Sequence, residues 1–131
     1  MEYRNIINRT QNSVFYDFLL KKILLIDARP KKIYNKETIP SSINIPFSLA
    51  EDIDIMNSIM EVLGMQRLSE GKWNESKALD VVIYCNGAWC GKSQTLIKSL
   101  LKVGYPAEKI HYYRGGFQMW KSLGLTTIKT K

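Results

Sequence analysis

The amino-acid sequence predicts an α/β fold in which a mostly parallel β-sheet is covered by helices on both faces. Two short, continuously apolar runs, 23–26 and 81–84, have the length and composition of strands that are buried on both faces. Stretches with apolar residues at helical spacing separate the expected strands, and no hairpin turn joins one strand directly to the next. Strands that alternate with helices in this way cross over and pair in parallel.

The amino-terminal stretch is expected to supply an edge strand and a helix. Residues 1–10 are polar and predict an extended lead-in, within which 6–7 is a candidate short strand. Asn12 or Ser13 can cap a helix that continues through Leu20, because apolar residues recur there at helical spacing.

The next stretch contains the first buried strand. The apolar run 23–26 is followed closely by Pro30, which stops it, and 31–35 is expected to form one helical turn. The segment 39–46 carries two prolines and predicts a turn, a short strand and a second turn.

A longer helix is predicted between Ser48 and Leu63. Ser48 can cap its first turn, an apolar stripe recurs at helical spacing, and Gly64 fits the position just after its end. Residues 65–80 show no periodicity. They are predicted to form a long connecting loop, of a length that is often functional or mobile.

The rest of the chain repeats the alternation of strand and helix after the run 81–84. A helix capped by Ser93 is predicted over 93–103, the last strand over 110–113 and a short terminal helix over 117–124.

Cys85 stands between the central strand and the helix that follows it, and it is the candidate nucleophile. Open α/β sheets bind ligands at the carboxyl ends of their strands. Backbone N–H groups and a helix amino terminus favour an anion there and lower the pKa of a thiol. The alternative interpretation is a buried structural cysteine. The residues expected to surround a bound anion are Asn86, Gly87, Ala88, Trp89, Cys90, Gly91, Lys92 and Ser93.

Other side chains near this loop leave two interpretations open. Cys90 is either a redox or resolving partner of Cys85 or incidental, since five residues of loop can fold back to disulfide distance. Lys92 is unfavourable at a helix start and so suggests an anion nearby; the alternative is a solvated lysine. Asp27 and Arg29 end a buried strand and are expected to pair inside the domain, in a structural role near the site.

Composition limits the classes of function. At 131 residues the chain is expected to fold as one domain, 1–131. Two cysteines and one histidine are too few for a zinc site, and neither a metal nor a cofactor is expected. The net charge of +7 suggests an anionic partner, but the lysines are scattered, which argues against nucleic acid. The sequence has no visible signal peptide or membrane span, so a cytoplasmic protein without a membrane partner is expected.

Five motifs in register resemble the rhodanese-like domain, over a core from about Leu19 to Leu125. They are Leu25-Ile26-Asp27-Ala28-Arg29, Ile39-Pro40-Ser41-Ser42-Ile43-Asn44-Ile45-Pro46, Val82-Ile83-Tyr84-Cys85, Gly104-Tyr105 and Arg114-Gly115-Gly116-Phe117-Gln118-Met119-Trp120. The resemblance implies a central, mainly parallel, five-stranded sheet and a loop cysteine that carries a persulfide sulfur.

The sequence departs from the usual family pattern at two places. Seven residues separate Cys85 from Ser93, where the family usually has five, and the longer loop includes Cys90. These features resemble a subgroup with two loop cysteines. Thr38 stands where the family often has histidine.

The leading functional hypothesis is a sulfurtransferase. A small anionic sulfur donor, such as thiosulfate or a persulfide, would load Cys85, and a thiophilic acceptor, for example a protein thiol, would take the sulfur. One alternative is a redox-sensing or binding module that uses a Cys85–Cys90 dithiol. A cysteine phosphatase on the same fold is less favoured, because it needs an arginine six residues after the cysteine and Gly91 stands there.

Overall fold

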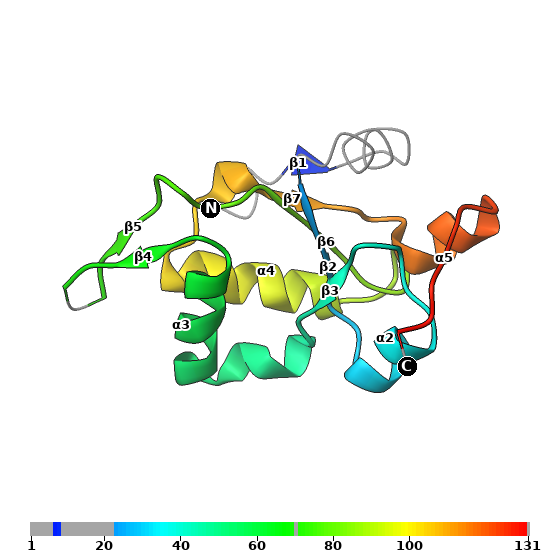
Figure 1. Ribbon diagram of the computed structural model, residues 1–131, viewed down its shortest axis with the longest axis horizontal. Helices are drawn as coiled ribbons and strands as arrows, with labels where there is room; N and C mark the ends of the chain where they lie inside the picture. Colours follow the sequence, from blue (N-terminus) through cyan, green and yellow to red (C-terminus); the bar gives the residue numbers. More distant parts are fainter. Residues whose placement is uncertain (1–6, 9–22, 70, 131) are drawn as a thin grey trace.

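The fold is built around a parallel β-sheet whose strands come from distant parts of the chain (Figure 1). The computed structural model describes residues 7–8, 23–69 and 71–130. Within these residues five strands, all paired in parallel, lie in the order β1-β7-β6-β2-β3. They are β1 (Ile7–Asn8), β2 (Leu24–Asp27), β3 (Ile43–Asn44), β6 (Val81–Tyr84) and β7 (Ile110–Tyr112). The helix expected to end at Leu20 lies outside the described residues.

The register of the sheet brings the carboxyl ends of its central strands together. Strand β2 pairs with β6 residue for residue, so that Asp27 lies beside Tyr84. On the other side of β6, Ile83 lies beside Tyr112 of β7. Any residue that directly follows β6 is therefore flanked by the ends of two neighbouring strands.

Helices cover both faces of the sheet, as the sequence predicts. On one face, α3 (Ile53–Val62) and α4 (Lys92–Val103) pack on β-strand side chains that include Ile26, Val81 and Ile83. On the opposite face, α5 (Gly116–Ser122) packs through Phe117 and Trp120, together with Leu25, Val82 and Tyr84. Trp120 is 1% exposed and lies in this part of the core. No helix in the described part of the chain is long and apolar enough to cross a membrane.

The start of α3 differs from the prediction. Ser48 does not cap this helix, because it lies inside a separate 3₁₀ helix, η2 (Phe47–Glu51). Asp52 is the cap: its carboxylate accepts hydrogen bonds from the N–H groups of Asp54 (3.0 Å) and Ile55 (3.2 Å). The expected end is confirmed, since Gly64 follows the helix with a φ of 97°. The helical turn predicted after Pro30 is also present, as α2 (Lys31–Lys36).

The stretch 65–80 is not the irregular loop that the sequence predicts. It contains an antiparallel hairpin of β4 (Gln66–Arg67) and β5 (Trp73–Asn74), which forms a second small sheet at one end of the molecule (Figure 1). The Arg67 guanidinium lies 5.2 Å from the centre of the Trp73 ring, so a cation–π contact bridges the two strands.

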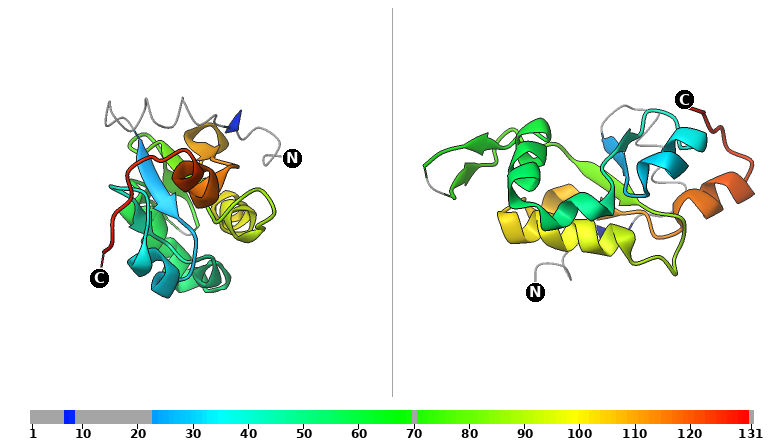
Figure 2. Two further views of the ribbon diagram at one scale, coloured as in Figure 1. Left: turned by 90° about the vertical axis from the view of Figure 1, so that its right-hand side faces the viewer. Right: turned by 90° about the horizontal axis from the view of Figure 1, so that it is seen from below.

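After α5 the chain runs back along α2, as a segment that we call the C-terminal strap, residues 125–130 (Figures 1 and 2). The backbone N–H groups of Thr38 and Ile128 each donate to the other residue's carbonyl, both at 2.9 Å. The indole of Trp120 donates to the carbonyl of Thr126 at 2.7 Å. The strap is thereby fixed both to α5 and to the segment between α2 and β3.

Candidate functional site

Cys85 directly follows β6, and α5 holds its backbone in place. Its carbonyl oxygen accepts a hydrogen bond from the Phe117 N–H, and the Asn86 carbonyl accepts one from the Gln118 N–H, both at 2.8 Å. Gly116 makes this contact possible: its φ is 63°, and a Cβ there would lie 2.5 Å from the Cys85 carbonyl oxygen. The start of the loop is therefore pinned to α5 at a place where a side chain would not fit.

The loop folds back on itself and joins the two cysteines. The Cys90 N–H donates to the Gly87 carbonyl at 3.1 Å, and a disulfide links Cys85 to Cys90, with 6.4 Å between their Cα atoms. This confirms that the loop can bring the two thiols together. Cys85 is 2% exposed and Cys90 is 9% exposed, so both sulfur atoms lie just below the surface.

The tip of the loop carries unused hydrogen-bond donors. In the part of the chain that the structure describes, the backbone N–H groups of Gly87, Ala88, Trp89 and Gly91 donate to no protein acceptor. Ala88 and Gly91 are exposed, while the Trp89 side chain, although 69% exposed, folds over Gly87. Backbone donors of this kind can bind an anion.

The start of α4 differs from the prediction at Ser93. The helix begins at Lys92 with Gly91 at the cap position, so Ser93 lies within the first turn and does not cap it. Its hydroxyl is fully buried and has no hydrogen-bond partner within the described residues. The Lys92 ammonium lies 5.6 Å from the centre of the Phe47 ring, which places this charge against η2.

Asp27 and Arg29 form the expected pair and also contact the loop. The Arg29 guanidinium donates to both carboxylate oxygens of Asp27, through Nε (2.9 and 3.1 Å) and Nη2 (2.7 Å). Both residues are buried. The guanidinium also donates to Asn86 Oδ1 at 3.4 Å and lies 4.3 Å from the centre of the Phe117 ring. The pair therefore supports the loop and α5 together.

Tyr84 also belongs to this support, a role that the sequence did not predict. Its hydroxyl lies 2.8 Å from Thr38 Oγ1 and 2.6 Å from Ser42 Oγ, and Thr38 Oγ1 donates to Asp27 Oδ2 at 2.8 Å. Burial, and then the charge of Asp27, raise the pKa of Tyr84 well above its usual value, so the phenol stays neutral. The apolar pattern of β6 gave no sign of a polar network behind the strand.

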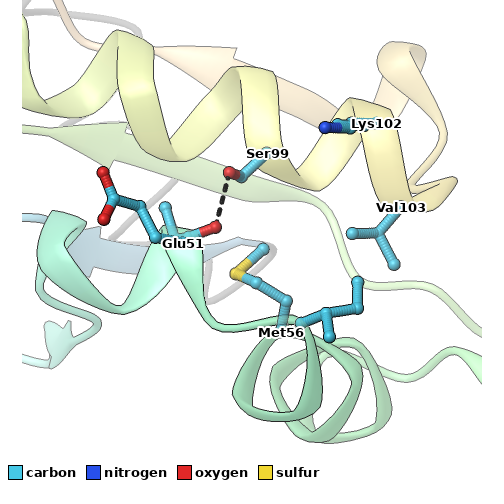
Figure 3. A pocket seen from close by; sticks show the side chains of 7 residues that line it. Glu51, Met56, Ser99, Lys102 and Val103 are labelled. Atoms are coloured by element: carbon cyan, nitrogen blue, oxygen red, sulfur yellow. Dashed lines mark hydrogen bonds between the residues drawn. The ribbon is translucent and has the colours of Figure 1, made fainter.

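A separate depression between η2, α3 and α4 contains no cysteine (Figure 3). The hydroxyl group of Ser99, which lines this depression, donates a hydrogen bond to the Ala50 carbonyl at 3.0 Å. The candidate site remains the loop between Cys85 and Ser93.

Comparison with known protein families identifies the family of the chain. The model of the Rhodanese-like domain matches residues 13–123, which is most of the chain. The chain belongs to the rhodanese-like domain family.

Solved structures support the rhodanese-like fold. A protein from Bacillus halodurans is 19% identical, with a TM-score of 0.65, and the match covers 95% of this chain and 77% of that one. A rhodanese-related protein from Thermoplasma volcanium is 21% identical, with a TM-score of 0.61 and coverage of 96% and 98%. A thiosulfate sulfurtransferase from Pseudomonas aeruginosa is 18% identical, with a TM-score of 0.65; the match covers 98% of this chain and 21% of that longer one. No curated protein matches this rhodanese-like chain by sequence.

Proposed function

We propose that this rhodanese-like protein is a sulfurtransferase that carries sulfane sulfur on Cys85. In the reduced protein the Cys85 thiolate attacks the outer sulfur of a donor such as thiosulfate. The sulfur–sulfur bond of the donor breaks, sulfite leaves with the electron pair, and a persulfide remains on Cys85. An acceptor thiolate, for example on a protein, then attacks the outer sulfur, and Cys85 leaves as a thiolate.

The observation that carries this proposal is the position of Cys85 at the start of a loop with unused hydrogen-bond donors. It follows a central strand at the carboxyl edge of a parallel sheet, where ligands of such sheets bind. The loop amides that donate to no protein acceptor and the start of α4 favour negative charge beside the sulfur. Donors fixed in place stabilise charge that develops during sulfur transfer, because they need no reorganisation.

Burial of the nucleophile favours a small donor. Cys85 has 2% of its surface exposed, which favours attack on the terminal sulfur of thiosulfate or of a small persulfide over attack on a bulky electrophile. The Ser93 hydroxyl, which has no partner in the described part of the chain, is a further donor in the first turn of α4. A reducing compartment such as the cytoplasm would keep the nucleophile available as a thiol.

Mass spectrometry of the reduced protein after thiosulfate treatment tests the proposal. We expect the mass of one added sulfur on Cys90→Ser and, in samples quenched early, on wild type, mapped to the peptide that contains Cys85, and none on Cys85→Ser. An unchanged mass on wild type, with Cys85 still open to alkylation, would show that this protein is not a sulfurtransferase for that donor.

The disulfide favours a second candidate, a redox-sensing module. Oxidation would convert the Cys85–Cys90 dithiol into the observed disulfide, and reduction would reverse it. This candidate requires that the reduced protein takes up no sulfur and that a partner binds only one redox state. Sulfur uptake by the reduced protein would favour the sulfurtransferase over the redox-sensing module.

A further inference from the structure

We propose that Cys90 is a second catalytic residue, which attacks the Cys85 persulfide and releases its outer sulfur as hydrosulfide. This inference rests on the proposed sulfur transfer and adds an activity to it, the reduction of a sulfane sulfur. The protein would then have two outcomes for a loaded sulfur: transfer to an acceptor, or release as hydrosulfide.

The geometry of the loop supports this step directly. The sulfur atoms of Cys85 and Cys90 are bonded in the structure, so no rearrangement of the fold is needed to bring them together. Both ends of the loop are held: α5 donates to the Cys85 carbonyl, and Thr95 donates to the Gly91 carbonyl through its N–H (3.0 Å) and its hydroxyl (3.1 Å). A thiol confined in this way has a high effective concentration beside the persulfide.

The step balances without an external oxidant. The Cys90 thiolate, having given its proton to solvent, attacks Sγ of Cys85, which is the inner sulfur of the persulfide. The bond between Sγ and the protonated outer sulfur breaks, and the outer sulfur leaves with the electron pair as hydrosulfide. The sulfane sulfur gains two electrons, and the two cysteine sulfurs lose two as they form the disulfide.

The observed bond also points to the sulfur that is attacked. Attack on the outer sulfur would move it onto Cys90 and would leave no disulfide. The disulfide instead joins Cys90 to Sγ of Cys85, so the structure shows that Cys90 can reach the inner sulfur. Release of hydrosulfide follows only from this inner attack.

A dithiol must reduce the disulfide before the next cycle, and the burial of the two cysteines indicates where it attacks. Cys90 is 9% exposed and Cys85 is 2% exposed, so an incoming thiolate reaches Cys90 first. Cys85 then leaves as a thiolate beside the donors of the loop, ready to be loaded again. A thiol of lower pKa is a better leaving group. The low pKa that we expect for Cys85 therefore also favours attack on Cys90 with Cys85 as the leaving group.

A single-turnover experiment tests the inference. Reduced wild type, Cys90→Ser and Cys90→Ala are loaded with thiosulfate that is labelled in its outer sulfur, desalted, and followed without any added thiol. We expect wild type to release labelled hydrosulfide and to form one Cys85–Cys90 disulfide per hydrosulfide. In both variants the persulfide that is loaded should last about tenfold longer or more than in wild type, because the intramolecular nucleophile is gone.

Each other outcome counts against a defined part of the scheme. Normal loading with equal persulfide lifetimes in all three proteins would overturn the role of Cys90 and leave the sulfurtransferase proposal intact. Labelled sulfur on Cys90, without hydrosulfide, would also overturn it. Failure of wild type to load would overturn both proposals. The ratio of hydrosulfide to disulfide is measured in wild type alone, so it decides the question even if a variant folds poorly.

The direction of reduction has its own readout. The oxidised protein is treated with limiting glutathione, quenched with an alkylating reagent and mapped by peptide mass. Glutathione on Cys90 with alkylated Cys85 is the expected result. Glutathione on Cys85 would overturn the assigned order of attack.

Discussion

At the scale of single residues, two opposing effects act on the Cys85 thiolate. Burial disfavours the charged form and raises the pKa of a thiol, whereas backbone donors and a helix start favour the thiolate and lower it. In this protein the loop offers several amides without a protein acceptor within the described residues, and α4 begins next to them. We expect the donors to outweigh the burial.

The first prediction follows from this balance. In reduced Cys90→Ser, where Cys85 is the remaining cysteine, the rate of alkylation by iodoacetamide should show a midpoint below about 8.5, the usual pKa of a thiol. Reduced Cys85→Ser provides the matched measurement on Cys90. A Cys85 midpoint at or above the usual value would mean that burial dominates and that the loop does not act as an anion site.

The residues of the site differ in how far the sequence could predict them. Asp27 and Arg29 were expected to pair, because unpaired charge at the end of a buried strand is costly. Their contacts with Asn86 and with the Phe117 ring depend on the strand order and on the position of α5, which no local pattern encodes. Ser93 fits a cap by residue type, but the helix starts one residue earlier.

At the scale of elements, the contact between α5 and the loop leaves no room for a side chain at Gly116. The Phe117 N–H reaches the Cys85 carbonyl because Gly116 has no side chain. Gly124, just beyond the end of the same helix, also has a positive φ, 73°, but nothing lies within 4 Å of a Cβ built there. The two glycines thus share the conformational requirement and differ in the space around them.

The second prediction uses this pair. Gly124→Ala should cost about 1–2 kcal/mol of unfolding free energy, the penalty for a side chain in the left-handed region. Gly116→Ala should cost about 1–3 kcal/mol more, because the new methyl group displaces the Cys85 and Asn86 backbone. Denaturant unfolding gives the two values, and loading with thiosulfate should be impaired only in Gly116→Ala. Equal losses of unfolding free energy and equal loading would show that the close contact at Gly116 matters neither for stability nor for sulfur loading.

The elements that the sequence predicted are those with a strong local pattern. Strands β2 and β6 lie in continuous apolar runs of the sequence, and α4 has a clear apolar stripe. The hairpin of β4 and β5 was missed because two-residue strands are too short to show an alternation. The start of α3 was misplaced because both Ser48 and Asp52 can cap a helix, and the choice depends on how η2 packs.

At the scale of the whole molecule, the C-terminal strap is connected to the site through Glu37 and Thr38. The Glu37 carboxylate accepts hydrogen bonds from Lys121 of α5 (2.7 Å) and from Thr127 of the strap (2.5 Å). Its backbone carbonyl accepts one from Arg29 at 2.7 Å, and the next residue, Thr38, binds Asp27. One segment thus joins the end of the described chain to the polar network behind the cysteine loop.

The last prediction tests this connection by pH. Hydrogen bonds from Lys121, first, and from Thr127 lower the pKa of Glu37. A carboxyl whose pKa is lower in the folded state stabilises the fold above its unfolded value, about 4.3, and this stabilisation is lost as the pH falls through the folded value. Glu37→Gln should therefore lower the melting temperature at pH 7, and the difference from wild type should disappear in acid.

The expected effect is modest, since a partly exposed ion pair contributes up to about 1 kcal/mol. Glu61→Gln is the matched control, because Glu61 is exposed and its side chain has no partner in the described part of the chain. It should melt like wild type at both pH values. If Glu37→Gln also melts like wild type at pH 7, the carboxylate does not hold the strap, and its other hydrogen bonds, with Thr38 and Trp120, hold it without Glu37.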